Sequence, residues 1–152
     1  MIEKKNFYIN GSWVVPKNPK DIQVVNPATE KSCAVISFGG KEDINDAVLA
    51  AKEAFKTWGF SSKEERLSLL ENFYALYKKR WNDITDAIIQ EMGAPKDFAL
   101  KLQTGTGASH TKSFIRYLKE FEFEKPLGEH AKNQRLIYEP KGVCALITPW
   151  NW

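Results

Sequence analysis

The sequence contains few of the residues on which metal centres, disulfide frameworks and membrane spans depend. Its 152 residues include two cysteines and two histidines. The cysteines, Cys33 and Cys144, lie too far apart for a metal-binding motif or for the disulfide framework of a small secreted protein. No apolar run approaches the roughly 18 residues that span a bilayer, and the first residues lack the apolar segment of a signal peptide. These absences predict a reduced, cytoplasmic protein without a metal site or a membrane segment.

The sequence also has little net charge. The 22 Lys and Arg residues nearly balance the 19 Asp and Glu residues, which leaves a net charge of +3. No run of basic residues concentrates this charge, and a basic helical nucleic-acid-binding protein is therefore excluded.

The length is sufficient for one domain, which would bury roughly 70% of the surface of its unfolded chain.

Turn residues near the start of the chain separate short β-prone runs. Residues 7–14 contain two such runs around Asn10-Gly11, a dipeptide that favours a type I′ turn, and they predict a β-hairpin. Residues 22–25 and 33–38 predict a second strand pair around the turn that Asn26-Pro27 initiates.

From Glu42 the spacing of apolar residues changes to the three-and-four pattern of an amphipathic helix. Glu42 and Asp43 lie in the first turn, where the helix dipole favours negative charge, and Gly59 ends the helix. We expect the apolar stripe of this helix to be core rather than a ligand platform; it comprises Ile44, Ala47, Val48, Ala51, Ala54, Phe55 and Trp58.

Ser62 and Glu65 form a capping-box pattern at the start of a second, longer helix. Its first apolar stripe would also fit a coiled coil: Leu67, Leu70, Tyr74, Tyr77, Trp81, Ile84 and Ile88. Further apolar residues widen this stripe, as packing within a globular domain requires: Leu69, Phe73, Leu76 and Ile89. Asn82-Asp83 can kink or split the helix, and Gly93 ends it.

A third helical stretch is predicted at residues 96–118, with Gly105 and Gly107 in its middle. Each glycine lowers helix stability by roughly 1 kcal/mol relative to alanine. A phosphate-binding loop is rejected, because no strand precedes the glycines and no third glycine or Gly-Lys follows them. Close approach of another helix explains the small residues better. Residues 135–140 then alternate weakly and predict an exposed or edge strand.

The end of the sequence combines an apolar run with a strand terminator. Residues 143–147 predict a strand buried on both faces, as in a parallel sheet. Pro149 has no N–H for a strand ladder, so the chain should turn there. Trp150 and Asn151 would then lie just past the carboxyl end of a strand, where open α/β sheets bind their ligands.

Several of these stretches together resemble the NAD(P)-dependent aldehyde dehydrogenase superfamily. The resemblance rests on Glu139-Pro140-Lys141-Gly142-Val143, the apolar run, and Pro149-Trp150-Asn151-Trp152. Nearer the start, the aromatic-Ile-Asn-Gly-x-Trp stretch at residues 8–13 and the Asn-Pro-Ala-Thr turn at residues 26–29 also match. Family members are several times longer, and the chain looks like their first third.

The resemblance implies an α/β fold: the N-terminal part of the aldehyde dehydrogenase fold, with β-hairpins, long helices and the first strand of a Rossmann-like dinucleotide-binding sheet. Residues 1–121 would be the N-terminal part of the NAD(P)-binding domain. Residues 122–140 would be bridging strands used in oligomer contacts, and residues 141–152 the first buried strand and Pro-Trp-Asn turn of the NAD(P)-binding core. The catalytic domain would be absent from this chain.

The resemblance also implies roles for individual residues. Asn151 would be the catalytic side-chain N–H donor that polarises the aldehyde and stabilises the oxyanion of the tetrahedral intermediate. Ile147, Thr148, Pro149 and Trp150 would line the nicotinamide–ribose side of the cofactor cleft. The implied cofactor is NAD or NADP, and the implied partners are an aldehyde substrate and further copies in a dimer or tetramer.

Other side chains with reactive chemistry do not fit the required roles. Neither Cys33, in a predicted hairpin strand, nor Cys144, in the apolar run, matches the family's nucleophile, and burial would make both inert. His110 and His130 have no spacing for a triad or a metal. Glu91 and Glu139 lack an acid partner, and the family's nucleophile and base lie beyond residue 152. The chain alone is therefore expected to be inactive, and a truncated, non-catalytic interaction or structural module is the alternative.

Overall fold

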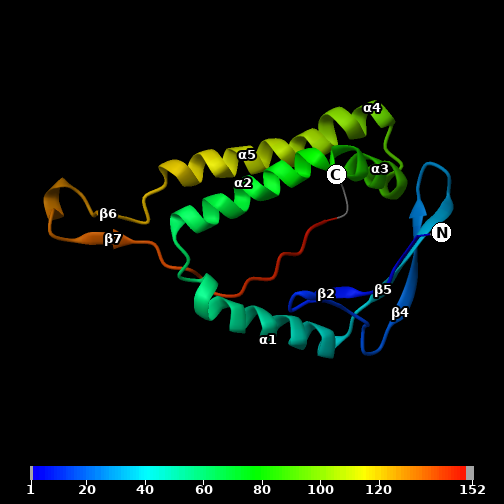
Figure 1. Cartoon of the computed structure of the whole chain (residues 1–152), viewed down its shortest axis with the longest axis horizontal. Coiled ribbons are helices and arrows are strands. Elements are labelled where there is room, and N and C mark those ends of the chain that lie inside the picture. Colours follow the sequence, from blue (N-terminus) through cyan, green and yellow to red (C-terminus); the bar gives the residue numbers. More distant parts are fainter. Residues whose placement is uncertain (1, 150–152) are drawn as a thin grey trace.

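The computed structural model describes residues 2–149, which form a mixed α/β chain of five helical segments and seven strands with two short helical turns (Figure 1). The strands are β1 (Ile2–Lys4), β2 (Phe7–Ile9), β3 (Ser12–Val14), β4 (Lys20–Asn26), β5 (Lys31–Phe38), β6 (Glu124–Pro126) and β7 (Arg135–Ile137). The helices are α1 (Lys41–Trp58), α2 (Lys63–Lys79), α3 (Trp81–Met92), α4 (Lys96–Phe98) and α5 (Thr104–Glu120). A π-helical turn, Ala99–Gln103, joins α4 to α5.

Both predicted strand pairs near the start of the chain are present. β2 and β3 form an antiparallel hairpin whose turn residues have positive φ angles, 51° at Asn10 and 77° at Gly11. β4 and β5 form the second pair, and the Asn26 side chain closes its turn by accepting from the Ala28 amide at 2.8 Å. β1, which the sequence did not predict, pairs with β5 in parallel and completes a three-stranded sheet in the order β1-β5-β4.

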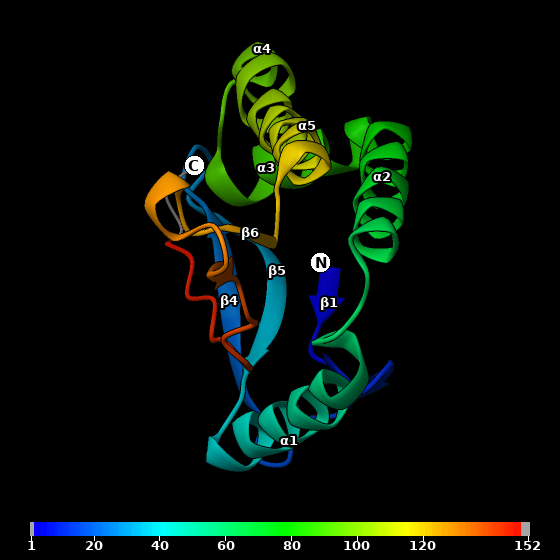
Figure 2. The same cartoon turned by 90° about the vertical axis from the view of Figure 1, so that its left-hand side faces the viewer.

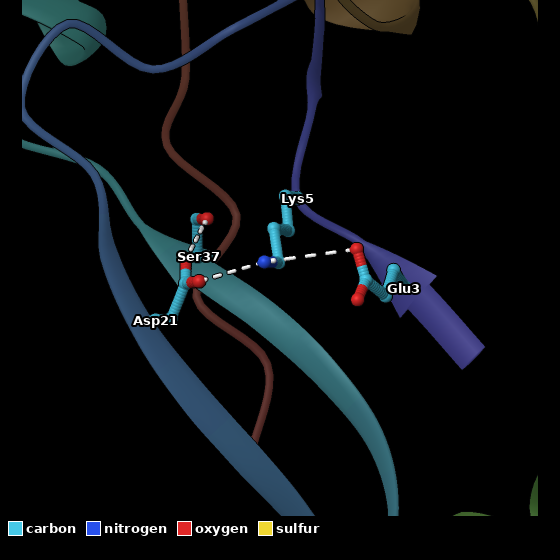
Figure 3. A network of polar contacts seen from close by, with 4 residues as sticks. All are labelled: Glu3, Lys5, Asp21 and Ser37. Carbon is cyan, nitrogen blue, oxygen red and sulfur yellow. Dashed lines mark hydrogen bonds and ion pairs between the residues drawn. The ribbon is translucent and has the colours of Figure 1, made fainter. Parts of the chain in front are cut away.

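A polar network attaches β1 to this sheet (Figure 3). Lys5 Nζ lies 2.8 Å from Asp21 Oδ2 of β4, and the other oxygen of Asp21 accepts from Ser37 of β5 at 3.0 Å. Glu3 lies on the far side of the lysine at 3.6 Å. The hydrogen bond to Lys5 lowers the pKa of Asp21, and the bond from Ser37 adds to this effect. The network is structural, since each member has a partner within it.

Strands β4 and β5 run between α1 and α3, which lie near opposite ends of the sheet (Figure 2). At the α1 end, Asp43 is 6% exposed and caps its own helix, accepting from the backbone N–H of Gly40 at 2.8 Å and of Lys17 at 3.0 Å. At the α3 end, Gly93 ends the helix, as the sequence predicted; it takes the left-handed conformation and lies against the β4–β5 turn. A Cβ at Gly93 would be 2.7 Å from the Ala28 amide nitrogen, so the contact requires a residue without a side chain.

The long predicted helix is split, as Asn82-Asp83 suggested, with Arg80 between α2 and α3. The Ser62 capping box is confirmed, with Ser62 accepting from Glu65 N–H at 3.1 Å and Glu65 accepting from Ser62 N–H at 2.7 Å. All seven residues of the first apolar stripe are half-buried. Three residues predicted to widen it remain exposed: Leu69 by 54%, Phe73 by 51% and Leu76 by 59%.

Helices α2 and α5 lie side by side in both views (Figures 1 and 2). Gly107 of α5 meets Tyr77 of α2, where an added Cβ would lie 3.1 Å from the ring atom Cζ and closer still to the hydroxyl. The predicted close approach is therefore confirmed at Gly107. At Gly105, an added Cβ would have no neighbour within 4 Å, so the prediction that another helix approaches closely is wrong for this glycine.

The π-helical turn was not anticipated from the sequence. Its Thr104 amide bonds back to Ala99 O, one residue further than in an α-helix. Aromatic donors from the preceding helices reach nearby carbonyls: Trp81 Nε1 donates to Leu100 O at 3.2 Å, and Tyr77 Oη donates to Thr104 O at 3.0 Å. Burial raises the pKa of Tyr77, which keeps its hydroxyl protonated as a donor.

Strands β6 and β7 form an antiparallel hairpin that projects from the helices, and we call residues 124–137 the arm (Figure 1). Most of its residues are exposed. The strand predicted at residues 135–140 is confirmed over Arg135–Ile137. His130 lies in a short 3-10 helix, Glu129–Ala131, at the turn of the arm.

Two predictions about apolar burial are wrong for this chain. The α1 stripe is largely exposed, with Ile44 at 62% and Trp58 at 47%. Residues 141–149 form no strand, and Ile147 is 93% exposed. A buried strand requires neighbours on both sides, and the described residues place none beside this segment. The whole chain exposes 11,946 Å², whereas a compact monomer of 17.4 kDa exposes about 7,900 Å².

Candidate functional site

The predicted cofactor-binding residues lie on the extended segment that returns from the arm, shown in red in Figure 1. Ile147, Thr148 and Pro149 are all exposed on this segment. Trp150 and the predicted catalytic residue Asn151 lie outside the described residues. The described part of the chain therefore holds one edge of the predicted site and none of the groups that would face it.

The two cysteines occupy different environments. Cys33 is half-buried in β5, and its thiol lies 3.3 Å from Val24 O and 3.4 Å from Gln90 O, so it links the strand pair to α3. Cys144 is exposed, which corrects the expectation that it is buried in a strand. The correction has the same cause as the missing strand, namely that no neighbouring strand covers residues 143–147.

The remaining titratable candidates are separate from one another. His110 is exposed on α5 and His130 is exposed at the turn of the arm, while Glu91 and Glu139 are exposed on α3 and after β7. Among residues 2–149, no three His, Cys, Asp or Glu side chains could hold a metal ion together. No helix in the same range is long and apolar enough to cross a membrane.

The structure reveals one buried polar group that sequence reasoning missed. Gln103, in the π-helical turn, is 8% exposed, and its Oε1 has no hydrogen-bond partner within the described residues. Beside it in sequence, Thr104 is fully buried and shares a hydrogen bond of 2.8 Å with Thr85 of α3. The sequence feature that could have indicated this buried pair is the placement of Gln103 and Thr104 directly before Gly105. A helical pattern alone, however, does not show where a π-helical turn will form.

Comparison with known proteins identifies the class of protein. Residues 13–152 match the Aldehyde dehydrogenase family. The match includes the Pro149-Trp150-Asn151 stretch and extends over nearly the whole chain. The chain therefore belongs to the aldehyde dehydrogenase family.

Individual relatives confirm the family and the fold. A 3-succinoylsemialdehyde-pyridine dehydrogenase from a Pseudomonas species is 43% identical over the full chain, which spans 31% of that protein's length. The crystal structure of an aldehyde dehydrogenase from Bartonella henselae superposes with a TM-score of 0.83 and 48% identity, over 85% of this chain and 27% of that one. Aldehyde dehydrogenase C from Pseudomonas syringae, solved with NAD+ and octanal, gives a TM-score of 0.78 and 35% identity, over 82% of this chain and 26% of that one.

These matches confirm that the chain has the fold of the N-terminal part of aldehyde dehydrogenases. It spans less than a third of the length of each relative. In each relative, more than two thirds of the polypeptide lies outside the matched region, and the many exposed large apolar side chains of this chain are consistent with that share.

Proposed function

We propose that this chain contributes the N-terminal part of an NAD(P)-dependent aldehyde dehydrogenase that oxidises an aldehyde to a carboxylic acid. The observation that carries the proposal is the 43% identity to a semialdehyde dehydrogenase over the whole chain. The Pro149-Trp150-Asn151 motif lies within the region that matches the family. NAD+ is bound in the crystal structure of the relative with 35% identity, which supports NAD as the cofactor, with NADP as the alternative.

Asn151 is assigned as the oxyanion donor because its amide can donate a hydrogen bond without changing its protonation state. Ile147, Thr148, Pro149 and Trp150 are assigned to the nicotinamide side of the cofactor cleft. An exposed edge of this kind binds a cofactor weakly, since a binding site needs walls on more than one side. The assignment therefore requires the facing part of the enzyme.

The arm is assigned to assembly of a homo-oligomer, a dimer or a tetramer. β6 and β7 pair only with each other among the described residues, so each has an outer edge with free backbone groups. An exposed strand edge is a template for pairing with another chain.

The test uses two proteins: the chain alone, and a chimera in which the chain replaces the matching segment of the Bartonella henselae enzyme. We expect the chimera to form NADH from NAD+ and an aldehyde, and the chain alone to form none. Asn151→Ala in the chimera should lower kcat by about 100- to 1000-fold. The affinity for NAD+ should change much less, because an oxyanion donor acts mainly in the transition state.

Two further variants separate the proposed roles. Asn151→Asp should be at least as damaging as Asn151→Ala, since a carboxylate repels the developing negative charge. Trp150→Ala should weaken NAD+ binding before it affects turnover. Near-normal kcat for a folded Asn151→Ala chimera would refute the assignment of the donor. NADH formation by the chain alone would refute the expectation that the nucleophile and base come from elsewhere.

A further inference from the structure

The first turn of α2 contacts two other chain segments through lysine and arginine side chains. Lys63 Nζ donates to Lys119 O at 2.7 Å and to Phe121 O at 3.2 Å, so it satisfies carbonyls at the carboxyl end of α5. Such terminal carbonyls have no partner within their own helix. One side chain of α2 therefore fixes the point at which the chain leaves α5 for the arm.

Arg66, three residues further along α2, contacts both the connection between α1 and α2 and the base of the arm. Its Nε donates to Ser61 Oγ at 2.9 Å, and its terminal nitrogen donates to Gly59 O at 3.2 Å, just after α1. The guanidinium carbon lies 5.3 Å from the centre of the Phe123 ring, one residue before β6. The planar fork of arginine can make these contacts at once, whereas a lysine ammonium cannot reproduce the fork.

An aromatic cluster joins the two chain segments that enter and leave the arm. Phe121 and Phe123 lie before β6, with ring centres 4.8 Å apart, and Phe121 lies 5.0 Å from Tyr138, which follows β7. The Tyr138 amide donates to Phe123 O at 2.8 Å. Both ends of the arm therefore meet at Phe121 and Phe123, and Arg66 covers the ring of Phe123.

We propose that Arg66 and Lys63 are positioning residues that fix the direction of the arm relative to the helices. Beyond this base, the arm is mostly exposed and has no other attachment to the helices among the described hydrogen bonds and ion pairs. Its direction is consequently set where it begins. This attachment of the arm is a property of the chain's own geometry and is independent of the proposed enzymatic function.

The experiment measures arm direction by electron–electron spin distances in the full chain. Spin labels are placed through Lys132→Cys at the turn of the arm and Lys112→Cys on α5, with Cys33→Ser and Cys144→Ser to remove the natural thiols. We expect a narrow distance distribution in this labelled parent and a clearly broader one after Arg66→Gln. Arg66→Lys should give an intermediate width.

Arg116→Gln is the matched control. Arg116 also lies over an aromatic ring, 4.8 Å from the centre of Tyr117, but it is on α5 and contacts no arm residue in the described interactions. This variant should leave the distribution unchanged. Equal widths for Arg66→Gln and the parent would overturn the proposal for Arg66.

Amide hydrogen exchange separates loss of positioning from general unfolding. In Arg66→Gln, the Tyr138 amide at the arm base should exchange about tenfold faster, the effect of losing one or two net hydrogen bonds. The Leu127 amide, which bonds to Gln134 O within the arm at 3.0 Å, should not change, nor should amides between β4 and β5. If β4–β5 exchange also rises, Arg66 stabilises the whole fold and the proposal fails for Arg66. Lys63→Gln tests the attachment of the arm at the carboxyl end of α5 by the same two measurements.

Discussion

Replacing Gly107 with alanine tests the close contact between α5 and α2. The new methyl group would point at the Tyr77 ring and hydroxyl, which lie on the facing helix α2. Gly105, two residues earlier in α5, has open space at the same position and provides a matched control. The two substitutions are chemically identical and share one helix, so the difference between them isolates the contact with Tyr77.

The expected magnitudes follow from helix propensity and packing. Each glycine-to-alanine change gains about 1 kcal/mol of helix stability. At Gly107 this gain is opposed by overpacking, which costs about 1–3 kcal/mol. Displacing the Tyr77 hydroxyl also breaks its hydrogen bond to Thr104 O, at a cost of about 1 kcal/mol. Gly105→Ala should therefore be stabilising, and Gly107→Ala should be less stable than Gly105→Ala by about 2–4 kcal/mol.

Urea unfolding followed by circular dichroism measures both variants. Tyr77→Phe completes a double-mutant cycle, because it removes the hydroxyl that the new methyl group meets first. Gly107→Ala should cost less in the Tyr77→Phe background than in the parent. Equal unfolding free energies for Gly105→Ala and Gly107→Ala would refute the close approach. Strict additivity of Gly107→Ala and Tyr77→Phe would refute the assignment of the clash to the hydroxyl.

Two further predictions concern Asp43 and the thiols. Hydrogen bonds from the backbone N–H groups of Gly40 and then Lys17 hold the pKa of Asp43 below its usual value. The stabilisation of the folded state by the Asp43 carboxylate should therefore be complete above the unfolded pKa of about 3.9 and should be lost as pH falls through the lower folded pKa. In thermal unfolding measured from pH 7 to 2, Asp43→Asn should lose less stability on acidification than the parent. Parallel plots of melting temperature against pH for the two proteins would contradict this. Iodoacetamide should modify exposed Cys144 before half-buried Cys33, as peptide mass spectrometry of Cys33→Ser and Cys144→Ser controls can establish.

Features that depend on a few neighbouring residues could be predicted from the sequence. Asn10-Gly11 determines a tight turn because both residues tolerate positive φ, and the Ser62–Glu65 capping box needs only its own four residues. The αL position of Gly93 is equally local. Strand β1 and the π-helical turn escaped prediction, because the first depends on pairing with β5 and the second on support from aromatic side chains of other helices.

Burial could not be predicted from periodicity alone. The apolar stripe of α1 and the seven-residue stripe that continues from α2 into α3 are equally regular, yet the first is largely exposed and the second is half-buried. The difference is the presence of a partner: α5 lies along α2, while the α1 stripe lacks a comparable helix among the described elements. Periodicity therefore identifies the apolar face of a helix but does not show which neighbouring element, if any, covers that face.

The same reasoning applies to the candidate site. The run at residues 143–147 has the composition of a strand buried on both faces, but in this chain it is extended and exposed, with Leu146 at 89%. Strand hydrogen bonds and two-sided burial both come from neighbouring polypeptide, so composition can select the conformation only where neighbours are present. In the proposed site, Asn151 would follow the strand end expected at Pro149, so its position would depend on that strand. A donor that must meet a developing oxyanion within hydrogen-bond distance needs that rigid support, and this is why the proposed chemistry belongs to the assembled enzyme rather than to the motif alone.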